Sequence, residues 1–139
     1  MTDLSLVEVS TDIQRIDVEY VHQCLKQTPW AKDRSLEEMK SCIQHSRNYG
    51  IYYADEQVGY ARLLTDYAFM AYILDVIVGE KHRGKGFARM LMEYILKDKA
   101  LTNIKIWRLG TDDAHGLYQK VGFTAIAQPE KLMEIKVKN

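Results

Sequence analysis

The sequence predicts an α/β domain in which helices flank a mixed, mostly antiparallel sheet. Three observations predict it: two helical patterns precede a hairpin of β-rich segments, the most apolar stretch runs straight into glycines, and the strongest amphipathic helix pattern follows at once. The 139 residues are 47% hydrophobic, without a repeat or a linker-like tract. We therefore expect residues 1–139 to form one domain with a sizeable core.

Two helices are predicted near the start of the chain. Apolar residues recur at helical spacing over residues 18–25, and this helix should close near Pro29, because the residue before a proline is pushed out of the α region. The second helix begins at Ser35, whose hydroxyl can cap free backbone amides while Glu38 reaches back to form a capping box.

Three strands are predicted next. Residues 49–54 and 58–65 are rich in β-branched and aromatic side chains around a turn at 55–57, which indicates an antiparallel hairpin. Residues 71–78 form an apolar run interrupted only by Asp75, which predicts a central strand buried on both faces.

The C-terminal third completes the predicted order of elements. A strand is expected over residues 104–109, followed by a short helix over 114–121 that Asp112 or Asp113 can cap. Gly122 suits the left-handed position at the end of that helix. The last two predicted strands are residues 124–126 and 133–137.

A turn rich in glycine and positive charge lies between the apolar strand and the amphipathic helix. The turn and the start of the helix comprise Arg83, Gly84, Lys85, Gly86, Phe87 and Ala88. A helix N-terminus carries unpaired backbone N–H groups and about half a positive charge, and glycines let an anion approach that backbone closely. This position predicts a phosphate-binding site.

Two familiar phosphate motifs fail at this turn. A Walker A loop requires a hydroxyl that binds magnesium where Gly86 stands. A dinucleotide fingerprint requires a third glycine where Arg89 stands, and close helix packing excludes so long a side chain.

The pattern R-x-x-G-x-A, formed by Arg83, Gly86 and Ala88, resembles the GNAT superfamily of N-acetyltransferases, in which it wraps the pyrophosphate of coenzyme A. A later A-x-x-x-Y-x-x-x-G-F segment is similar to the family's as well, with Ala114, Tyr118, Gly122 and Phe123. The resemblance covers about residues 51–123. It extends to a bacterial branch of unassigned substrate through Trp30-Ala31 with Arg34, Thr65-Asp66-Tyr67, and Gly110-Thr111 with Asp113-Ala114-His115.

The resemblance implies a fold and a reaction. The sheet is expected to splay between its fourth and fifth strands, with acetyl-coenzyme A in the split and its pantetheine arm paired to the backbone of Ile77 and Val78. A primary amine would attack directly in a ternary complex, near the hydroxyl of Tyr118. The family's acceptor side implies Trp30 and Arg34 as substrate contacts. Asp66 and Tyr67 are further candidates for holding the acceptor.

Two catalytic candidates also have structural interpretations. Asp75 is the only charge in the apolar strand, so it either accepts the amine's proton, with a pKa raised by burial, or pairs with Arg62 or Arg108 on a neighbouring strand. Tyr118 either hydrogen-bonds the departing thiolate or is a core aromatic.

Composition and sequence pattern limit the partners, location and metals that are expected. Nineteen Lys and Arg balance nineteen Asp and Glu, so no basic field favours nucleic acid. With no signal-peptide pattern and no apolar run of about 20 residues, a cytoplasmic protein that does not enter membranes is expected. The histidines and two cysteines share no metal-ligand spacing, so no metal is expected. The resemblance implies a small-molecule or protein amine as the acceptor. A homodimer also fits the family. The alternative function is a non-catalytic sensor that binds acyl-coenzyme A.

Overall fold

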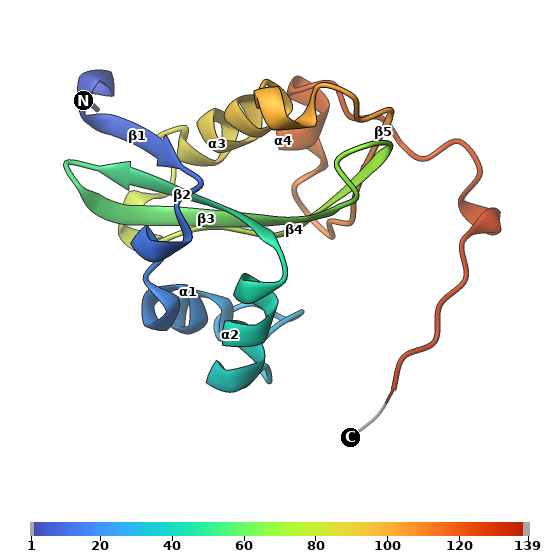
Figure 1. The fold of residues 1–139 in the computed structure, drawn as a ribbon, viewed down its shortest axis with the longest axis horizontal. Coiled ribbons are helices and arrows are strands. Elements are labelled where there is room, and N and C mark those ends of the chain that lie inside the picture. Colours follow the sequence, from blue (N-terminus) through green and yellow to red (C-terminus); the bar gives the residue numbers. More distant parts are fainter. Residues whose placement is uncertain (1, 138–139) are drawn as a thin grey trace.

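The computed structural model describes residues 2–137 and contains a five-stranded sheet with helices on both faces (Figure 1). The strands are β1 (Val7–Ser10), β2 (Arg47–Tyr53), β3 (Glu56–Thr65), β4 (Met70–Val78) and β5 (Ile106–Leu109). The α-helices are α1 (Val18–Leu25), α2 (Leu36–Gln44), α3 (Phe87–Leu96) and α4 (His115–Lys120).

The strands lie in sequence order across the sheet. Strands β1 to β4 are antiparallel to their neighbours, and β5 runs parallel to β4, which confirms a mixed, mostly antiparallel sheet. The predicted hairpin is β2–β3, but its turn is Ala54-Asp55 rather than residues 55–57. Both turn residues have positive φ, as the tightest hairpin turns require, and β3 therefore starts earlier than predicted.

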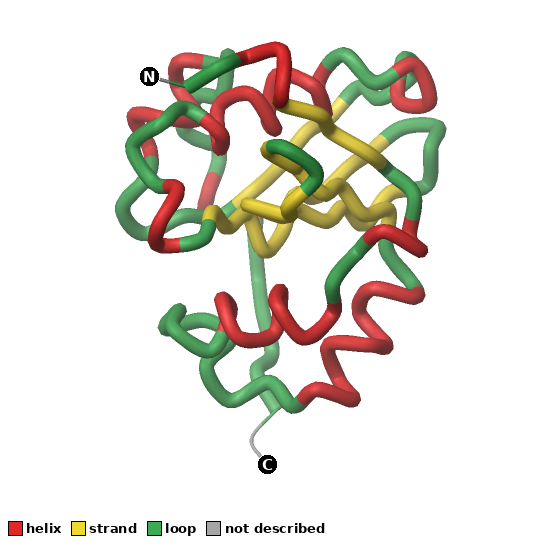
Figure 2. The backbone as a smooth tube through the Cα atoms, turned by 90° about the vertical axis from the view of Figure 1, so that its left-hand side faces the viewer, coloured by secondary structure: helices red, strands yellow, loops and turns green. Residues whose placement is uncertain are grey.

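The sheet separates two hydrophobic cores (Figure 2). One core packs α3 and α4 against β2, β3 and β4, and includes Phe87, Leu91, Ile95 and Tyr118. The other packs α1 and α2 against the opposite face. Strand β4 alternates between more and less buried residues, with Tyr72 exposed, so the prediction that it is buried on both faces throughout is wrong.

Helix ends follow the sequence signals at α2 but not at α4. The capping box of α2 is complete: Ser35 Oγ accepts from the Glu38 amide at 3.0 Å, and Glu38 Oε1 accepts from the Ser35 amide at 2.9 Å. Helix α4 instead has Ala114 at its N-cap, whose amide donates to Thr111 Oγ1 at 3.0 Å, so neither predicted aspartate caps it. Gly122 has φ of 109°, as predicted for its left-handed position.

The two predicted closing strands are absent. Residues 124–137 contain one short 3-10 turn, Pro129–Lys131, and otherwise run as irregular chain. In Figure 1 this segment leaves the domain beside β5 and extends away from the sheet. A strand forms only with a partner strand, and none lies beside it within residues 2–137.

Within the same range, every helix is too short to cross a bilayer.

Candidate functional site

Strands β4 and β5 pair over only half of β4. The register runs from Met70 opposite Ile106 to Ile73 opposite Leu109, and β4 then continues to Val78 with no β5 residue beside it. The edge of residues 74–78 that faces away from β3 is therefore open. The sheet is therefore splayed between its fourth and fifth strands, as the resemblance implied.

A β-bulge lies at the point where the split begins. One β3 residue, Ala61, stands opposite two β4 residues, Asp75 and Val76, and Asp75 has φ of 53°. Ile73 packs in the core on the α3 side, whereas Asp75, two residues later, reaches Arg34 on the α1–α2 side. In a regular strand these two side chains would share a face, so the bulge turns Asp75 to the other side.

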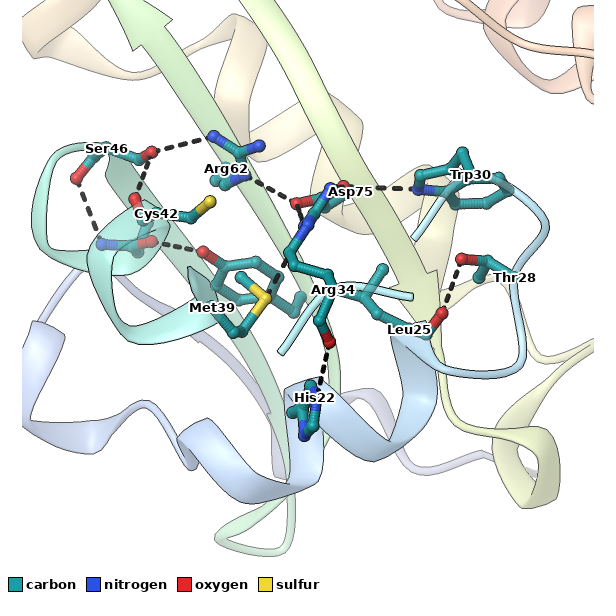
Figure 3. Close-up of polar contacts among 12 residues, drawn as sticks. His22, Leu25, Thr28, Trp30, Arg34, Met39, Cys42, Ser46, Arg62 and Asp75 are labelled. Atoms are coloured by element: carbon teal, nitrogen blue, oxygen red, sulfur yellow. Dashed lines mark hydrogen bonds and ion pairs between the residues drawn. The ribbon is translucent and has the colours of Figure 1, made fainter. Parts of the chain in front are cut away.

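Asp75 is held by three side chains in that position (Figure 3). Its Oδ2 accepts from Arg34 Nη1 and from Arg62 Nε, both at 2.6 Å, and its Oδ1 accepts from Trp30 Nε1 at 3.3 Å. The Asp75 side chain is only 1% exposed. Burial acts to raise the pKa of Asp75, but the hydrogen bonds from Arg34 and Arg62 outweigh it and hold the pKa below its ordinary value.

This geometry supports the ion-pair interpretation of Asp75. The carboxylate is an ion-pair partner of Arg62, as one alternative predicted, and also of Arg34. Arg108 stands opposite Tyr72 on the paired part of the sheet and forms no ion pair within residues 2–137, so that alternative is wrong. The expectation of a pKa raised by burial is also wrong, because two guanidinium groups compensate the buried charge.

The glycine turn presents an open helix N-terminus. Gly84 and Gly86 have φ of 77° and 85°, a left-handed region that favours glycine, and a Cβ at Gly84 would meet no atom within 4 Å. Gly86 is the N-cap of α3 and supplies no side-chain acceptor for the first helical amides. Arg83 folds back along the turn, and its Nε donates to the Val78 carbonyl at 3.2 Å.

The backbone groups at the end of β4 do not all face the split. The carbonyl of Ile77 points at Gly59 on β3, whereas the carbonyl of Val78 points outward and meets Arg83. Backbone groups of an antiparallel strand alternate between its two sides. Val78 is thus available to a ligand in the split, whereas the Ile77 carbonyl is directed toward β3. The contact of Ile77 with the pantetheine arm stays a prediction.

Two buried polar atoms without a partner flank the same turn. Within residues 2–137, Tyr20 Oη and His82 Nδ1 are the buried side-chain polar atoms that form no hydrogen bond. Tyr20 Oη lies where a Cβ on Gly79 would be, and His82 is in the turn itself. Unpartnered buried polar groups are uncommon in folded proteins, and their presence beside a glycine turn fits a site that receives a ligand.

A hollow of about 340 Å³ opens at the turn, lined by Thr2, Tyr53, Gly84, Lys85 and Phe87. A larger one, about 620 Å³, lies beside the C-terminal end of α3 and includes none of the turn residues. Size therefore does not identify the site. The smaller hollow lies at the start of α3 and is lined by the cationic Lys85, which are the features that an anion needs.

Tyr118 lies in α4 with its ring in the core and its hydroxyl unbonded. The residue is 8% exposed, its ring meets Phe123 edge-on at 6.1 Å between centroids, and its hydroxyl forms no hydrogen bond within residues 2–137. Burial raises the pKa of Tyr118 above the ordinary phenol value. Its hydroxyl is thus a neutral donor that is free to bind.

Comparison with known proteins gives this geometry a family. The family model for acetyltransferases of the GNAT family matches residues 13–123. The chain belongs to the GNAT acetyltransferase family. A solved protein from Xanthomonas campestris, described as belonging to the GNAT family, is 41% identical with a TM-score of 0.89, covering 94% of this chain and 93% of its own.

Two more distant proteins are also similar to this chain, one in sequence and one in fold. An uncharacterised N-acetyltransferase from Prochlorococcus marinus, ycf52-like, is 25% identical over 124 residues, which cover 84% of this chain and 67% of the relative. The solved glucosamine-6-phosphate N-acetyltransferase of Arabidopsis thaliana has a TM-score of 0.63 at 14% identity, with 96% of this chain and 97% of that one covered. That last likeness concerns the fold alone.

In this GNAT domain, two predicted acceptor residues lie away from the split. Asp66 Oδ1 accepts from the amides of residues 68, 69 and 70, and these bonds, that of Phe69 first, lower the pKa of Asp66. Tyr67, with φ of 61°, lies 5.8 Å from the guanidinium of Arg47. Both precede β4, whereas the split begins beyond Ile73, roughly 10 Å further along the strand. The structure does not bring them together with Trp30, Arg34 and the glycine turn.

Sequence reasoning did not single out Tyr20 and His82, the two residues with unpartnered buried polar atoms beside the glycine turn. Tyr20 belongs to an ordinary amphipathic pattern in α1, and His82 has no motif partner. Only burial without a hydrogen-bond partner distinguishes them, and that is a property of the tertiary structure.

Proposed function

We propose that this GNAT protein is an N-acetyltransferase that uses acetyl-coenzyme A and transfers the acetyl group to a primary amine by direct attack in a ternary complex. The observation that carries the proposal is the open edge of β4 at Val78, which leads directly to the uncapped, glycine-lined N-terminus of α3. Such an edge can pair with an amide-bearing arm, and such a helix end can hold phosphates.

The cofactor's phosphates fit the turn on chemical grounds. The amides of Phe87 and Ala88 have no side-chain cap, and Arg83, Gly84, Lys85 and Gly86 add positive charge and close backbone approach. In the binding state Arg83 exchanges its bond to the Val78 carbonyl for a phosphate oxygen, which frees Val78 for the pantetheine arm.

Coenzyme A supplies an acetyl thioester whose carbonyl an amine can attack. The Val78 amide lies on the side of β4 away from β3, because the next amide, that of Gly79, donates to Val58 on β3 and backbone groups alternate; it serves as a donor for the thioester oxygen. Tyr118 donates a hydrogen bond to the departing thiolate sulfur, and the proton that the attacking amine loses passes through water to that thiolate, which leaves as the coenzyme A thiol. With ordinary pKa values of about 10 for a phenol and 8.5 for a thiol, full proton transfer is uphill by about 2 kcal/mol. Burial increases this gap, so Tyr118 acts as a hydrogen-bond donor.

Trp30 and Arg34 form the acceptor side in this proposal. Trp30 is 56% exposed although its indole N–H is bound to Asp75, so an aromatic face remains available beside the bulge. An aromatic face attracts a cationic amine. Asp75 positions Trp30 and Arg34, and with both oxygens bound and a lowered pKa it is not the proton acceptor.

Isothermal titration of the purified protein tests cofactor binding. We expect saturable binding of acetyl-coenzyme A and none of ATP with magnesium, because Gly86 supplies no hydroxyl for the metal. Binding of ATP with magnesium, or no binding of acetyl-coenzyme A, would contradict the proposal.

Thiol release over a panel of polyamines, amino sugars, amino acids and peptide amines then tests transfer. An amine-dependent rate supports the enzyme, and its best substrate defines the acceptor. Saturable cofactor binding without turnover on any amine would instead support an acyl-coenzyme A sensor.

Replacing Tyr118 with Phe is expected to lower turnover about 10- to 100-fold while affinity for acetyl-coenzyme A stays within about twofold, because only the hydroxyl is removed from a ring that packs in the core. Steady-state thiol release together with titration measures both quantities. Tyr94→Phe is the matched control, since that tyrosine is exposed on α3, and it should behave as wild type. Wild-type turnover in Tyr118→Phe would mean that Tyr118 only packs in the core.

A further inference from the structure

Helices α1 and α2 cover only part of their face of the sheet. The core that contains these helices includes Tyr60 of β3 and Ile77 of β4, both toward the end of β4 at which the split lies. Toward the other end of the same two strands, Leu64 and Tyr72 stand opposite each other and are 47% and 38% exposed. The α1–α2 face beside the start of the split is therefore accessible to a ligand.

Tyr72 and Arg108 lie side by side on this accessible face, where β5 separates from β4. The two residues are partners in the parallel register, and the next pair along is the last one between the strands. Trp107 and Leu109 pack against the core on the α3 side, so the alternation of a strand directs Arg108 to the α1–α2 side. The Tyr72 hydroxyl extends across β5 to Gly110, where it would lie 3.6 Å from a Cβ. Both side chains therefore border the start of the split.

Positive charge exceeds negative charge at this place. Two guanidinium groups share the single carboxylate of Asp75, which leaves one positive charge in excess. Arg108 adds a further positive charge, because it forms no ion pair within residues 2–137. Asp112 and Asp113 follow β5 in the chain, but both are exposed and neither pairs with Arg108. A guanidinium without a protein partner at the edge of a ligand site is suited to bind an anionic group of the ligand.

We propose that the acceptor is a primary amine that also carries an anionic group, a carboxylate or a phosphate, and that Arg108 binds this group. The inference rests on the proposed transfer of acetyl to an amine. Tyr72 and Asp75 are three residues apart on β4, roughly 10 Å at the rise of a strand, and Trp30 is bound to Asp75 (Figure 3). An amine against the Trp30 ring can therefore direct an anion a few bonds away toward Arg108, whose planar guanidinium binds two oxygens at once. The Tyr72 hydroxyl is a second donor at the same place.

Thiol release with matched amines tests the anionic group. Leucine is compared with leucine amide, which lacks the carboxylate, and phosphoethanolamine is compared with ethanolamine, which lacks the phosphate. Arg108→Gln should lower kcat/KM about 10- to 100-fold for the anionic amine of at least one pair, and less than about threefold for its neutral counterpart, because only the anion loses a charged donor. Comparing each amine between wild type and variant cancels the intrinsic reactivity of the amines. The pair with the larger effect identifies the anion as a carboxylate or a phosphate.

Lys97→Gln is the control for the loss of one positive charge. Lys97 is exposed at the C-terminal end of α3, on the other face of the sheet, and makes no side-chain bond within residues 2–137. This variant should treat all four amines as the wild type does. Circular dichroism should show both variants folded, since neither substitution breaks an ion pair.

Titration of the protein loaded with coenzyme A repeats the comparison without turnover. If Arg108→Gln changed kcat/KM and affinity equally for the anionic and neutral amines, or not at all, the inference would be overturned while acetyl transfer stood. Absence of turnover on every amine, with tighter binding of an anionic amine that Arg108→Gln removes, would contradict the transfer and support the anion site. Binding of none of the four amines would also overturn the inference.

Discussion

Replacing Asp75 with Asn is expected to lower the free energy of unfolding by about 3 kcal/mol, the lower end of what removal of one partner from a buried ion pair costs. The substitution leaves the guanidinium groups of Arg34 and Arg62, 18% and 9% exposed, without a counter-charge. Asn has nearly the same shape and tolerates positive φ, so the bulge itself can remain. For a chain of this length the melting temperature should fall by about 10 °C.

The matched control is Glu93→Gln, the same removal of one charge from an ion pair. Glu93 pairs with Arg89 one turn away on the exposed side of α3, where such pairs contribute little. Thermal unfolding of both variants should show a large change at Asp75 and less than about 0.5 kcal/mol at Glu93. Equal and small changes would mean that the Asp75 cluster does not hold the loop between α1 and α2 to the sheet.

The effect of Asp75→Asn should also depend on pH in one direction. The folded-state pKa of Asp75 is depressed, so the stability it contributes is present above the unfolded pKa of about 3.9 and is lost as pH falls through the lower, folded value. The difference in melting temperature between wild type and variant should therefore be constant from pH 5 to 8 and shrink below about pH 4. A difference that grew on acidification would contradict an ionised Asp75.

Replacing Arg83 with Glu is expected to weaken binding of acetyl-coenzyme A about 100-fold. The change removes a cationic donor beside the N-terminus of α3 and places a carboxylate against the phosphates, and hydrogen bonds to charged groups contribute about 1.5 to 3 kcal/mol each. Arg83 is exposed and its one side-chain bond, to the Val78 carbonyl, is at the surface, so the fold should remain. Titration with acetyl-coenzyme A measures the loss.

Lys81→Glu is the control for the change in net charge. Lys81 is exposed two residues earlier, in the 3-10 turn Glu80–His82, and makes no side-chain bond within residues 2–137. Its variant should keep affinity within about threefold. Equal losses of affinity in both variants would mean that the net charge near the turn is responsible, and the assignment of a phosphate contact to Arg83 would fail. Unchanged affinity in Arg83→Glu would also contradict that assignment.

The candidate site could be predicted from the sequence only in part. The glycine turn could be predicted because left-handed glycines, a strand before them and a helix after them are all local. The choice between proton acceptor and ion-pair partner for Asp75 could not be predicted. Arg34 is 41 residues away along the chain, and it reaches the carboxylate only because the bulge turns the Asp75 side chain. The sequence pattern does not distinguish Ile77 from Val78, and only their register with β3 shows which residue's backbone groups face the split.

The sequence by itself determined the elements whose signals are local. The capping box of Ser35, the amphipathic pattern of α3 and the glycines before it act over a few residues, so the chain needs no distant contact to form them. Tertiary structure alone decided the Asp75 ion pairs, the unpartnered Tyr20 and His82, and the unpaired residues 132–137. The physical reason is that charge pairing, burial and strand pairing depend on which distant segments meet, and the local pattern of a strand does not name its partner.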